Sequence, residues 1–240
     1  MLNEQNKRAF LHSFSLALGR DNVPTEIEPY DYSKGPSKRM MSEVTTQDEA
    51  VERFKKECDF LSIKYAETTE EGLKDIIMDV IDGYGGGKVI YPQVDQIKEY
   101  GLDEVFAAYE GKDGHSFVLW DPEKGREVNI NNAQDASIGI TFPKMAIAET
   151  ATLVQPMTSG SGRSVGLLPL THLAILRRST IRRRMIDTME VLRDEYREDP
   201  ANFPSAVVHI SGPSSTSDIE LVRVVGVHGP VNITYIIIND

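Results

Sequence analysis

The stretch 45–92 alternates two hydrophobic patterns, and this alternation decides the fold class. In order, its pieces read TTQDEAVERFKKECD (45–59), FLSIKYA (60–66), TEEGLKDIIMDVID (69–82) and KVIYP (88–92). The first and third pieces space apolar residues as helices do, whereas the second and fourth are short apolar runs typical of strands. Such alternation predicts an α/β fold with a mainly parallel sheet flanked by helices.

The amino-terminal segment predicts an arm outside this domain. NEQNKRAFLHSFSLALGR (3–20) places Phe10, Phe14 and Leu18 at helical spacing, and the following residues to about 40 are rich in proline and lack a period. We therefore expect a helical arm and linker over 1–40 and one α/β domain over 41–240. The arm can pack on another subunit, so a homo-oligomer is an expected possibility.

Composition excludes several classes of partner. The 240 residues are 40% hydrophobic and 26% charged, an ordinary globular mix, and the formal charge of -11 argues against whole-surface binding to nucleic acid or an anionic membrane. No apolar run approaches the roughly 20 residues that a membrane-spanning helix needs. The first residues also lack the charged, apolar and cleavage regions of a signal peptide, so we expect a cytoplasmic protein.

A single cysteine, Cys58, leaves no internal disulfide and no four-thiolate iron-sulfur cluster in this chain. We expect Cys58 to be structural, no cofactor in this chain, and any cluster to belong to a partner protein. The isolated histidines lack the spacing of a metal motif, so no metal site is predicted.

The middle and carboxy-terminal thirds mix strands and helices. HSFVLWDPEKGREVNI (115–130) predicts a hairpin, with Phe117 and Trp120 as core candidates. A helix is predicted over 181–199, with Ile181, Met185, Met189, Leu192 and Tyr196 on one stripe. Buried strands are predicted over 205–210 and 232–240, and the arginine cluster over 177–184 predicts salt bridges or a partner chain.

Two glycine-rich stretches invite a nucleotide or anion interpretation. DGYGGGKV (82–89) fits neither the P-loop nor the Rossmann fingerprint, so a helix-to-strand connection is predicted. TSGSGRSVG (158–166) surrounds Arg163 with small residues, whose bare N–H groups and guanidinium could hold a carboxylate or phosphate. The alternative is a flexible surface loop with a solvated arginine.

Polar residues near strand ends supply the remaining candidates. Glu149 could be a base, a nucleophile or a helix cap. VVHISGPSSTSDIE (207–220) predicts a strand, a turn and a helix start, where an anion could bind beyond the strand, and VVGVHGP (224–230) repeats the turn. The two turns could face one crevice. Asp218 and His228 join Glu149 as catalytic candidates, with capping the alternative for Asp218 and core placement that for His228. The candidates for binding an anion or substrate, besides Arg163, are Ser211, Gly212, Ser214, Thr216 and His172, with core placement the alternative for His172.

The segments AFLHSFSLALGR, AIAETATLV, GRSVGLLPLTHLAIL and ISGPSSTSDIELVRVVGVHGP together resemble the LUD-domain family of lactate utilization proteins. The resemblance implies a Rossmann-like fold similar to the NagB/RpiA/CoA-transferase group and a role in oxidising L-lactate to pyruvate alongside iron-sulfur proteins. The residues in the matching motifs are Glu149, Thr150, Arg163, Pro169, His172, Ser211, Gly212, Pro213, Ser214, Thr216, Asp218, Glu220, His228 and Gly229. The chain departs from the family pattern at Ser215, where arginine is usual, and at Ala151, where glycine is usual.

The expected function is therefore a component of an L-lactate utilization system, with iron-sulfur lactate utilization proteins as partners and a small carboxylate or other anion as ligand. Catalysis by this chain alone is not expected, because it shows neither a dinucleotide fingerprint nor cluster ligands. Two alternatives stay open. One is a CoA-transferase-like or cyclo-ligase-like enzyme with Glu149 as nucleophile, and the other is a non-catalytic assembly subunit.

Overall fold

The computed structural model describes residues 3–24, 46–217, 222 and 224–240, in two units, Met1–Glu43 and Val44–Asp240. The first unit contains helix α1 (Glu4–Ala17), in which the Asn3 side chain accepts a hydrogen bond from the Gln5 N–H group as an N-cap. Phe10 and Phe14 stack along its exposed side, as the helical spacing predicts. The predicted linker lies mostly outside the described residues.

The second unit is built on a six-stranded sheet in which every pairing is parallel. In spatial order its strands are β1 (Lys64–Thr68), β12 (Asn232–Ile238), β7 (Thr171–Arg177), β4 (Ile138–Thr141), β2 (Lys88–Pro92) and β3 (Ser116–Trp120). The predicted alternation over 45–92 is confirmed as α3 (Gln47–Leu61), β1, α4 (Leu73–Gly83) and β2. Thr46 begins α3 with a capping box to Glu49.

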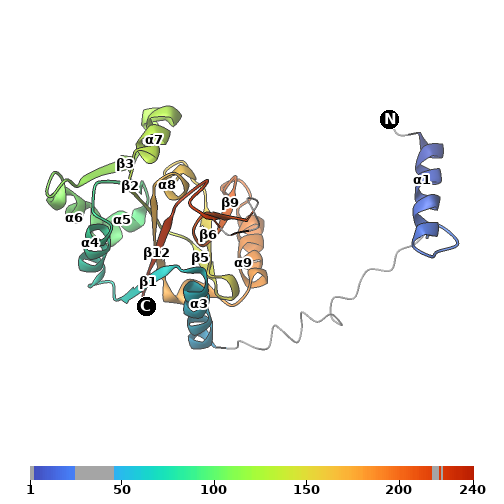
Figure 1. Cartoon of the computed structure of the whole chain (residues 1–240), viewed down its shortest axis with the longest axis horizontal. Coiled ribbons are helices and arrows are strands. Elements are labelled where there is room, and N and C mark those ends of the chain that lie inside the picture. Colours follow the sequence, from blue (N-terminus) through green and yellow to red (C-terminus); the bar gives the residue numbers. More distant parts are fainter. Residues whose placement is uncertain (1–2, 25–45, 218–221, 223) are drawn as a thin grey trace. The chain divides into compact units, whose positions relative to one another are not determined.

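Helices α4, α5 (Asp95–Glu99) and α6 (Leu102–Tyr109) cover one face of this sheet, as Figure 1 shows. The opposite face carries α3 and a four-stranded sheet with the order β8-β5-β6-β9. The bounds of these strands are β8 (Ile181–Arg182), β5 (Met145–Ile147), β6 (Thr152–Pro156) and β9 (Val207–Ser211). Helix α9 (Met185–Glu198) packs on the outer side of the second sheet through Leu192. The unit thus has helix, sheet, sheet and helix layers, and the α/β prediction is confirmed.

Successive side chains of β6 point to opposite faces of its sheet and so pack in different layers. Leu153 packs in the core between the two sheets, whereas Val154 packs with Leu192 of α9. Gln155, two residues after Leu153, therefore also faces the main sheet. Cys58 lies in the same inter-sheet core, where burial raises the pKa of its thiol to about 12, as suits a structural thiol.

The predicted hairpin over 115–130 is wrong. After β3 the chain forms a 3-10 turn, η2 (Pro122–Lys124), and then helix α7 (Gly125–Gln134). The buried Asn129 explains the helix, because its amide accepts from the Asp121 N–H group and donates to the Asp121 and Gly125 carbonyls. Trp120 is buried as predicted, and Phe117 is half-buried against the core.

Two further predictions need correction. The helix over 181–199 begins only at Met185, because Ile181 belongs to β8, and Met185, Met189 and Tyr196 are about half exposed. Strand β9, predicted as buried, is half-exposed because only one of its faces meets the inter-sheet core. The strand over 232–240 is confirmed as the buried β12.

Candidate functional site

Glu149 lies in the turn η3 (Ala148–Thr150) and is held at the start of α9. Its carboxylate accepts a hydrogen bond from the Arg184 guanidinium at 2.8 Å and from the Met185 N–H group at 3.3 Å. A carboxylate at a helix N-terminus is stabilised by the helix dipole and by the unpaired N–H groups. Of the three predicted roles, this geometry matches the helix cap.

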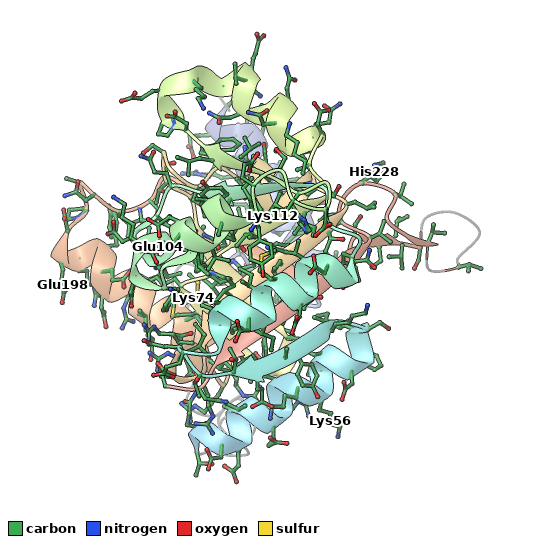
Figure 2. All side chains as sticks on the ribbon, turned by 90° about the vertical axis from the view of Figure 1, so that its left-hand side faces the viewer. Lys56, Lys74, Glu104, Lys112, Glu198 and His228 are labelled. Carbon is green, nitrogen blue, oxygen red and sulfur yellow. The ribbon has the colours of Figure 1, made fainter. Side chains whose placement is uncertain are left out.

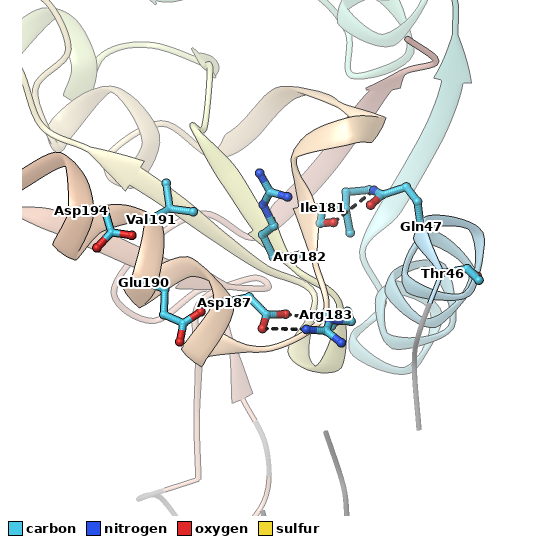
Figure 3. Close-up of a pocket in the computed structure, with 9 residues that line it drawn as sticks. All are labelled: Thr46, Gln47, Ile181, Arg182, Arg183, Asp187, Glu190, Val191 and Asp194. Carbon is cyan, nitrogen blue, oxygen red and sulfur yellow. Dashed lines mark hydrogen bonds and ion pairs between the residues drawn. The ribbon is translucent and has the colours of Figure 1, made fainter. Parts of the chain in front are cut away.

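The predicted arginine cluster forms salt bridges with acidic neighbours. Arg183 pairs with Asp187 at 3.1 Å, and Arg178, in the turn η4 (Arg178–Thr180), pairs with Asp48. Beside these residues lies a cleft of about 440 Å³. Arg182 lies on one side of it and the carboxylates of α9 on the other (Figure 3). The cleft is open and of mixed charge.

A chain of hydroxyl groups joins two of the predicted motifs. Thr150 and Thr152 share a hydrogen bond of 2.7 Å, and Thr152 and Ser211 share one of 2.6 Å. This series of hydrogen bonds forms because β6 pairs with β9 in a register that places Thr152 opposite Ser211. Gly212 follows in the left-handed region at φ 76°, which glycine adopts without strain.

The two glycine-containing turns near the carboxy terminus contact each other, whereas the predicted shared crevice stays a prediction. Ser214 connects them: its N–H group donates to the Pro230 carbonyl, its carbonyl accepts from Gly226, and its hydroxyl accepts from the His228 N–H group. The His228 side chain is exposed and lies at the surface of this loop in Figure 2. The N–H, carbonyl and hydroxyl groups of Ser214 are thus all engaged in hydrogen bonds within the loop.

The predicted helix start after Pro213 is wrong at Ser215 and Thr216. These residues form β10 (Ser215–Thr216), which pairs antiparallel with β11 (Val224–Val225). Asp218 and Glu220 lie outside the described residues. The predicted position beyond a carboxyl end of the parallel sheet is also wrong, because β9 belongs to the second sheet and this loop leads into the amino end of β12.

The glycine- and serine-rich loop 158–163 lies at the carboxyl ends of β2 and β3 instead. The Gln93 N–H group donates to the Gly160 carbonyl, and the Trp120 indole donates to the Ser159 carbonyl. A Cβ atom at Gly162 would meet the Trp120 ring at 2.2 Å. These contacts make the loop a packed element, whose glycines allow close approach.

Helix α8 (Ser164–Leu167) continues the loop across the sheet. A Cβ atom at Gly139 of β4 would stand 1.8 Å from the Val165 carbonyl oxygen, so only glycine allows this approach. Arg163 precedes α8 and is exposed, and it forms no ion pair within the described part of the chain. It lies near the carboxyl ends of β2 and β3, on the edge of the parallel sheet where ligands of open α/β sheets bind.

Beneath this loop lies a small, partly enclosed space between the two sheets, which we call the inter-sheet cavity. It measures about 10 Å³, room for one water-sized group, and the exposed residue Arg163 is part of its lining. Its lining comes from β4, β6, β9, the loop and α8: Thr141, Gln155, Met157, Ser161, Gly162, Arg163, Gly166, Leu167, Val208 and Ile210.

His172 reaches this cavity only through Thr141. The two side chains share a hydrogen bond of 2.7 Å, both are buried, and Gly166 covers them. Burial lowers the pKa of His172 from 6.5 to about 4, so the ring is neutral near pH 7. His172 thus contacts Thr141 but is not itself part of the cavity lining, and its predicted role in ligand binding stays a prediction.

Thr141 and Gln155 are the residues that sequence reasoning missed. Gln155 Oε1 is buried and has no hydrogen-bond partner in the described part of the chain, and the same holds for Nδ1 of His172. The available signal was a polar residue at an inward position of an apolar run, in SIGITF and in TLVQP. The structure brings both together with Arg163, whereas Glu149 and the Ser214 loop make their own separate contacts.

The fold and this cavity define an α/β protein with a small pocket between its parallel sheet and a second sheet. The LUD domain family profile matches residues 44–238, and the chain belongs to that family. It is 36% identical to Lactate utilization protein C of Macrococcus caseolyticus over 98% of this chain and 96% of that one, and 34% identical to that of Bacillus subtilis over 98% and 97%. A DUF162 family protein from Deinococcus radiodurans shares the fold, with a TM-score of 0.57, 18% identity and coverage of 81% of this chain and 99% of that one.

Membrane-spanning helices and clusters of metal-binding side chains are both absent from the described residues. None of the helices there is long and apolar enough to cross a membrane. No group of three or more His, Cys, Asp or Glu side chains in the same residues is placed to hold a metal ion.

Proposed function

We propose that this chain is a component of an L-lactate utilization system and contributes to the oxidation of L-lactate to pyruvate together with iron-sulfur partner proteins. The name shared by relatives that match nearly the full length of the chain supports the role in lactate utilization. Arg163 at the inter-sheet cavity carries the site-level part of the proposal, because an exposed guanidinium can bind a carboxylate with two hydrogen bonds.

In the proposed complex, this chain and its iron-sulfur partners would have different roles in the reaction. Oxidation of lactate to pyruvate releases two electrons and two protons, and the iron-sulfur clusters of the partners would accept the electrons. This chain would bind and orient the lactate carboxylate through Arg163, and the loop that carries Arg163 is fixed by its packing on Gln93 and Trp120. The cytoplasmic location stays a prediction.

The test is lactate-dependent dye reduction, measured anaerobically with the chain alone and then mixed with its candidate iron-sulfur partners. We expect activity only in the mixture and a large rise in the lactate KM for Arg163→Ala. Arg126→Ala is the matched control, since Arg126 is also exposed but lies on α7. Absence of lactate-dependent reduction in the mixture would overturn the proposal, and unchanged kinetics in Arg163→Ala would leave the assembly-subunit alternative.

The transferase-like alternative requires Glu149 to act as a nucleophile. A nucleophilic carboxylate would have to leave Arg184 and the Met185 N–H group, both of which stabilise its charged form and lower its nucleophilicity. A covalent acyl adduct on Glu149, found by peptide mass spectrometry after incubation with an acyl-CoA, would favour this alternative.

A further inference from the structure

We propose that the inter-sheet cavity receives the hydroxyl group of a 2-hydroxy carboxylate, with Gln155 as hydrogen-bond acceptor, Thr141 as donor, and Arg163 on the adjacent carboxylate. The inference rests on the proposed function for the identity of the ligand. It goes further by assigning the group that distinguishes a 2-hydroxy acid from a 2-oxo acid or a plain carboxylic acid.

Gln155 supplies the acceptor. Its Nε2 donates to the neighbouring Pro156 carbonyl at 3.1 Å, and a carbonyl can only accept, so the amide orientation is fixed and Oε1 is the free end. The residue is 5% exposed, and Oε1 has no partner among the described residues. A buried amide oxygen without a partner is rare in proteins and indicates a missing donor.

Thr141 supplies the donor. Its hydroxyl oxygen lies 2.7 Å from Nε2 of His172, whose Nδ1 has no partner among the described residues. A buried N–H group without a partner is rarer than a bare acceptor, so the proton belongs on Nε2 and the ring donates to the Thr141 oxygen. The Thr141 proton is then available for a ligand, and His172 acts as a positioning residue.

The size of the cavity matches one hydroxyl group. Thr141 and Gln155 line the same space of about 10 Å³, so both address one water-sized group. The rest of a lactate-sized ligand would lie toward Arg163, the exposed residue of the lining. Because the carbon that carries the hydroxyl is bonded to the carboxylate carbon, one small molecule can satisfy both ends.

The chemistry of the pair selects among ligands. A hydroxyl donates to Gln155 and accepts from Thr141, whereas the keto oxygen of pyruvate can only accept and leaves Gln155 unpaired. Propionate has the same carboxylate and chain length but no oxygen at this position. Sites built to pair a buried polar group reject an analogue that lacks the matching group much more strongly than one that differs by a methylene.

The experiment is an NMR titration of the full chain with ¹³C-methyl-labelled methionine, using L-lactate, pyruvate and propionate as probes. Met157 lines the cavity and reports binding, and Met78, in the core on the other face of the main sheet, is the internal control. We expect the Met157 methyl to shift with L-lactate, and the Kd for propionate and pyruvate to be at least about 10-fold higher. Equal affinity for lactate and propionate would overturn the inference.

Two variants test the assignment to Gln155. In Gln155→Met the affinity for L-lactate should fall to that for propionate, while the affinity for propionate stays unchanged; Gln134→Met, at an exposed position of α7, should behave as the native chain. A Gln155→Met chain that keeps its preference for lactate would contradict the assignment. If that variant does not fold, the three-probe series on the native chain still decides.

The result also separates this inference from the proposed function. A shift of Met157 with none of the three probes means that the cavity holds a structural water only, and the inference is then wrong. Lactate-dependent dye reduction by the mixed complex would in that case still support the proposed function. Conversely, selective lactate binding without dye reduction would support the cavity assignment and argue against the oxidative role.

Discussion

The loop 158–163 and the described parts of the loop 212–230 both contain glycine and serine but are held in different ways. The first is fixed by close packing, since Gly160 and Gly162 press against Gln93 and Trp120. The second is fixed by the hydrogen bonds of Ser214 and leaves several valines at the surface. Glycine serves close approach in one loop and turn formation in the other, so composition alone does not identify which loop encloses a site.

The packed loop should be the more sensitive of the two, and Gly139→Ala should show the largest effect. The added methyl would stand 1.8 Å from the Val165 carbonyl oxygen, so α8 must move and the inter-sheet cavity must change shape. We expect a loss of about 3 kcal/mol or more in the free energy of unfolding, measured by urea denaturation. Gly83→Ala, with no atom within 4 Å of the added methyl, is the control. Equal stability of the two variants would show that α8 is not held as described.

The buried pair Thr141 and His172, beneath that loop, should make the free energy of unfolding depend on pH. The pKa of His172 is lowered to about 4 in the folded state against 6.5 for an ordinary histidine. The unfolded chain therefore takes up this proton first as the pH falls, so the contribution is complete above pH 6.5 and is lost on acidification toward pH 4. It amounts to about 3 kcal/mol.

The measurement compares the free energy of unfolding between pH 7.5 and 4 for the native chain and for His172→Leu. The variant should lose less stability on acidification, although other groups titrate in both proteins. His209→Leu, which changes an exposed histidine of β9, should follow the native curve. Parallel curves for the native chain and His172→Leu would contradict the assignment of the acid sensitivity to this ring.

Removing one member of that pair tests its hydrogen bond separately from its charge. Thr141→Val keeps the shape of the side chain but leaves the His172 N–H group buried and unpaired, which should cost about 1–3 kcal/mol in thermal or urea unfolding. The double variant Thr141→Val/His172→Leu should recover much of this loss, because two apolar partners need no hydrogen bond. Additive losses would mean that the two side chains are not coupled.

The parallel sheet was easier to predict from the sequence than the second sheet. The stretch 45–92 specified the parallel sheet because its helices and strands follow one another with clear periods. The second sheet was harder to predict, because β5 and β8 have three and two residues and form only through pairing with distant segments. Helix α7 was predicted as a hairpin, because the contacts of Asn129 that support it have no hydrophobic period.

The candidate site was predictable only in its outer part. Arg163 and His172 stand out in the sequence by residue type, and both lie at or next to the cavity. Thr141 and Gln155 do not stand out, because each is a single polar residue in an apolar strand. Their importance follows from the packing of one sheet on the other, which places two inward-facing positions around one space.

The smallest effect should come from the loop that depends on hydrogen bonds. Ser214→Ala removes the acceptor of the His228 N–H group, a partly exposed contact of 3.3 Å for which water can substitute. The free energy of unfolding should change by less than about 1 kcal/mol, while amide hydrogen exchange at His228 should accelerate. Ser217→Ala, at an exposed position of the same loop, should change neither. A loss as large as that of Gly139→Ala would mean that the surface loop is as tightly coupled to the core as α8, and the contrast between the two loops would no longer hold.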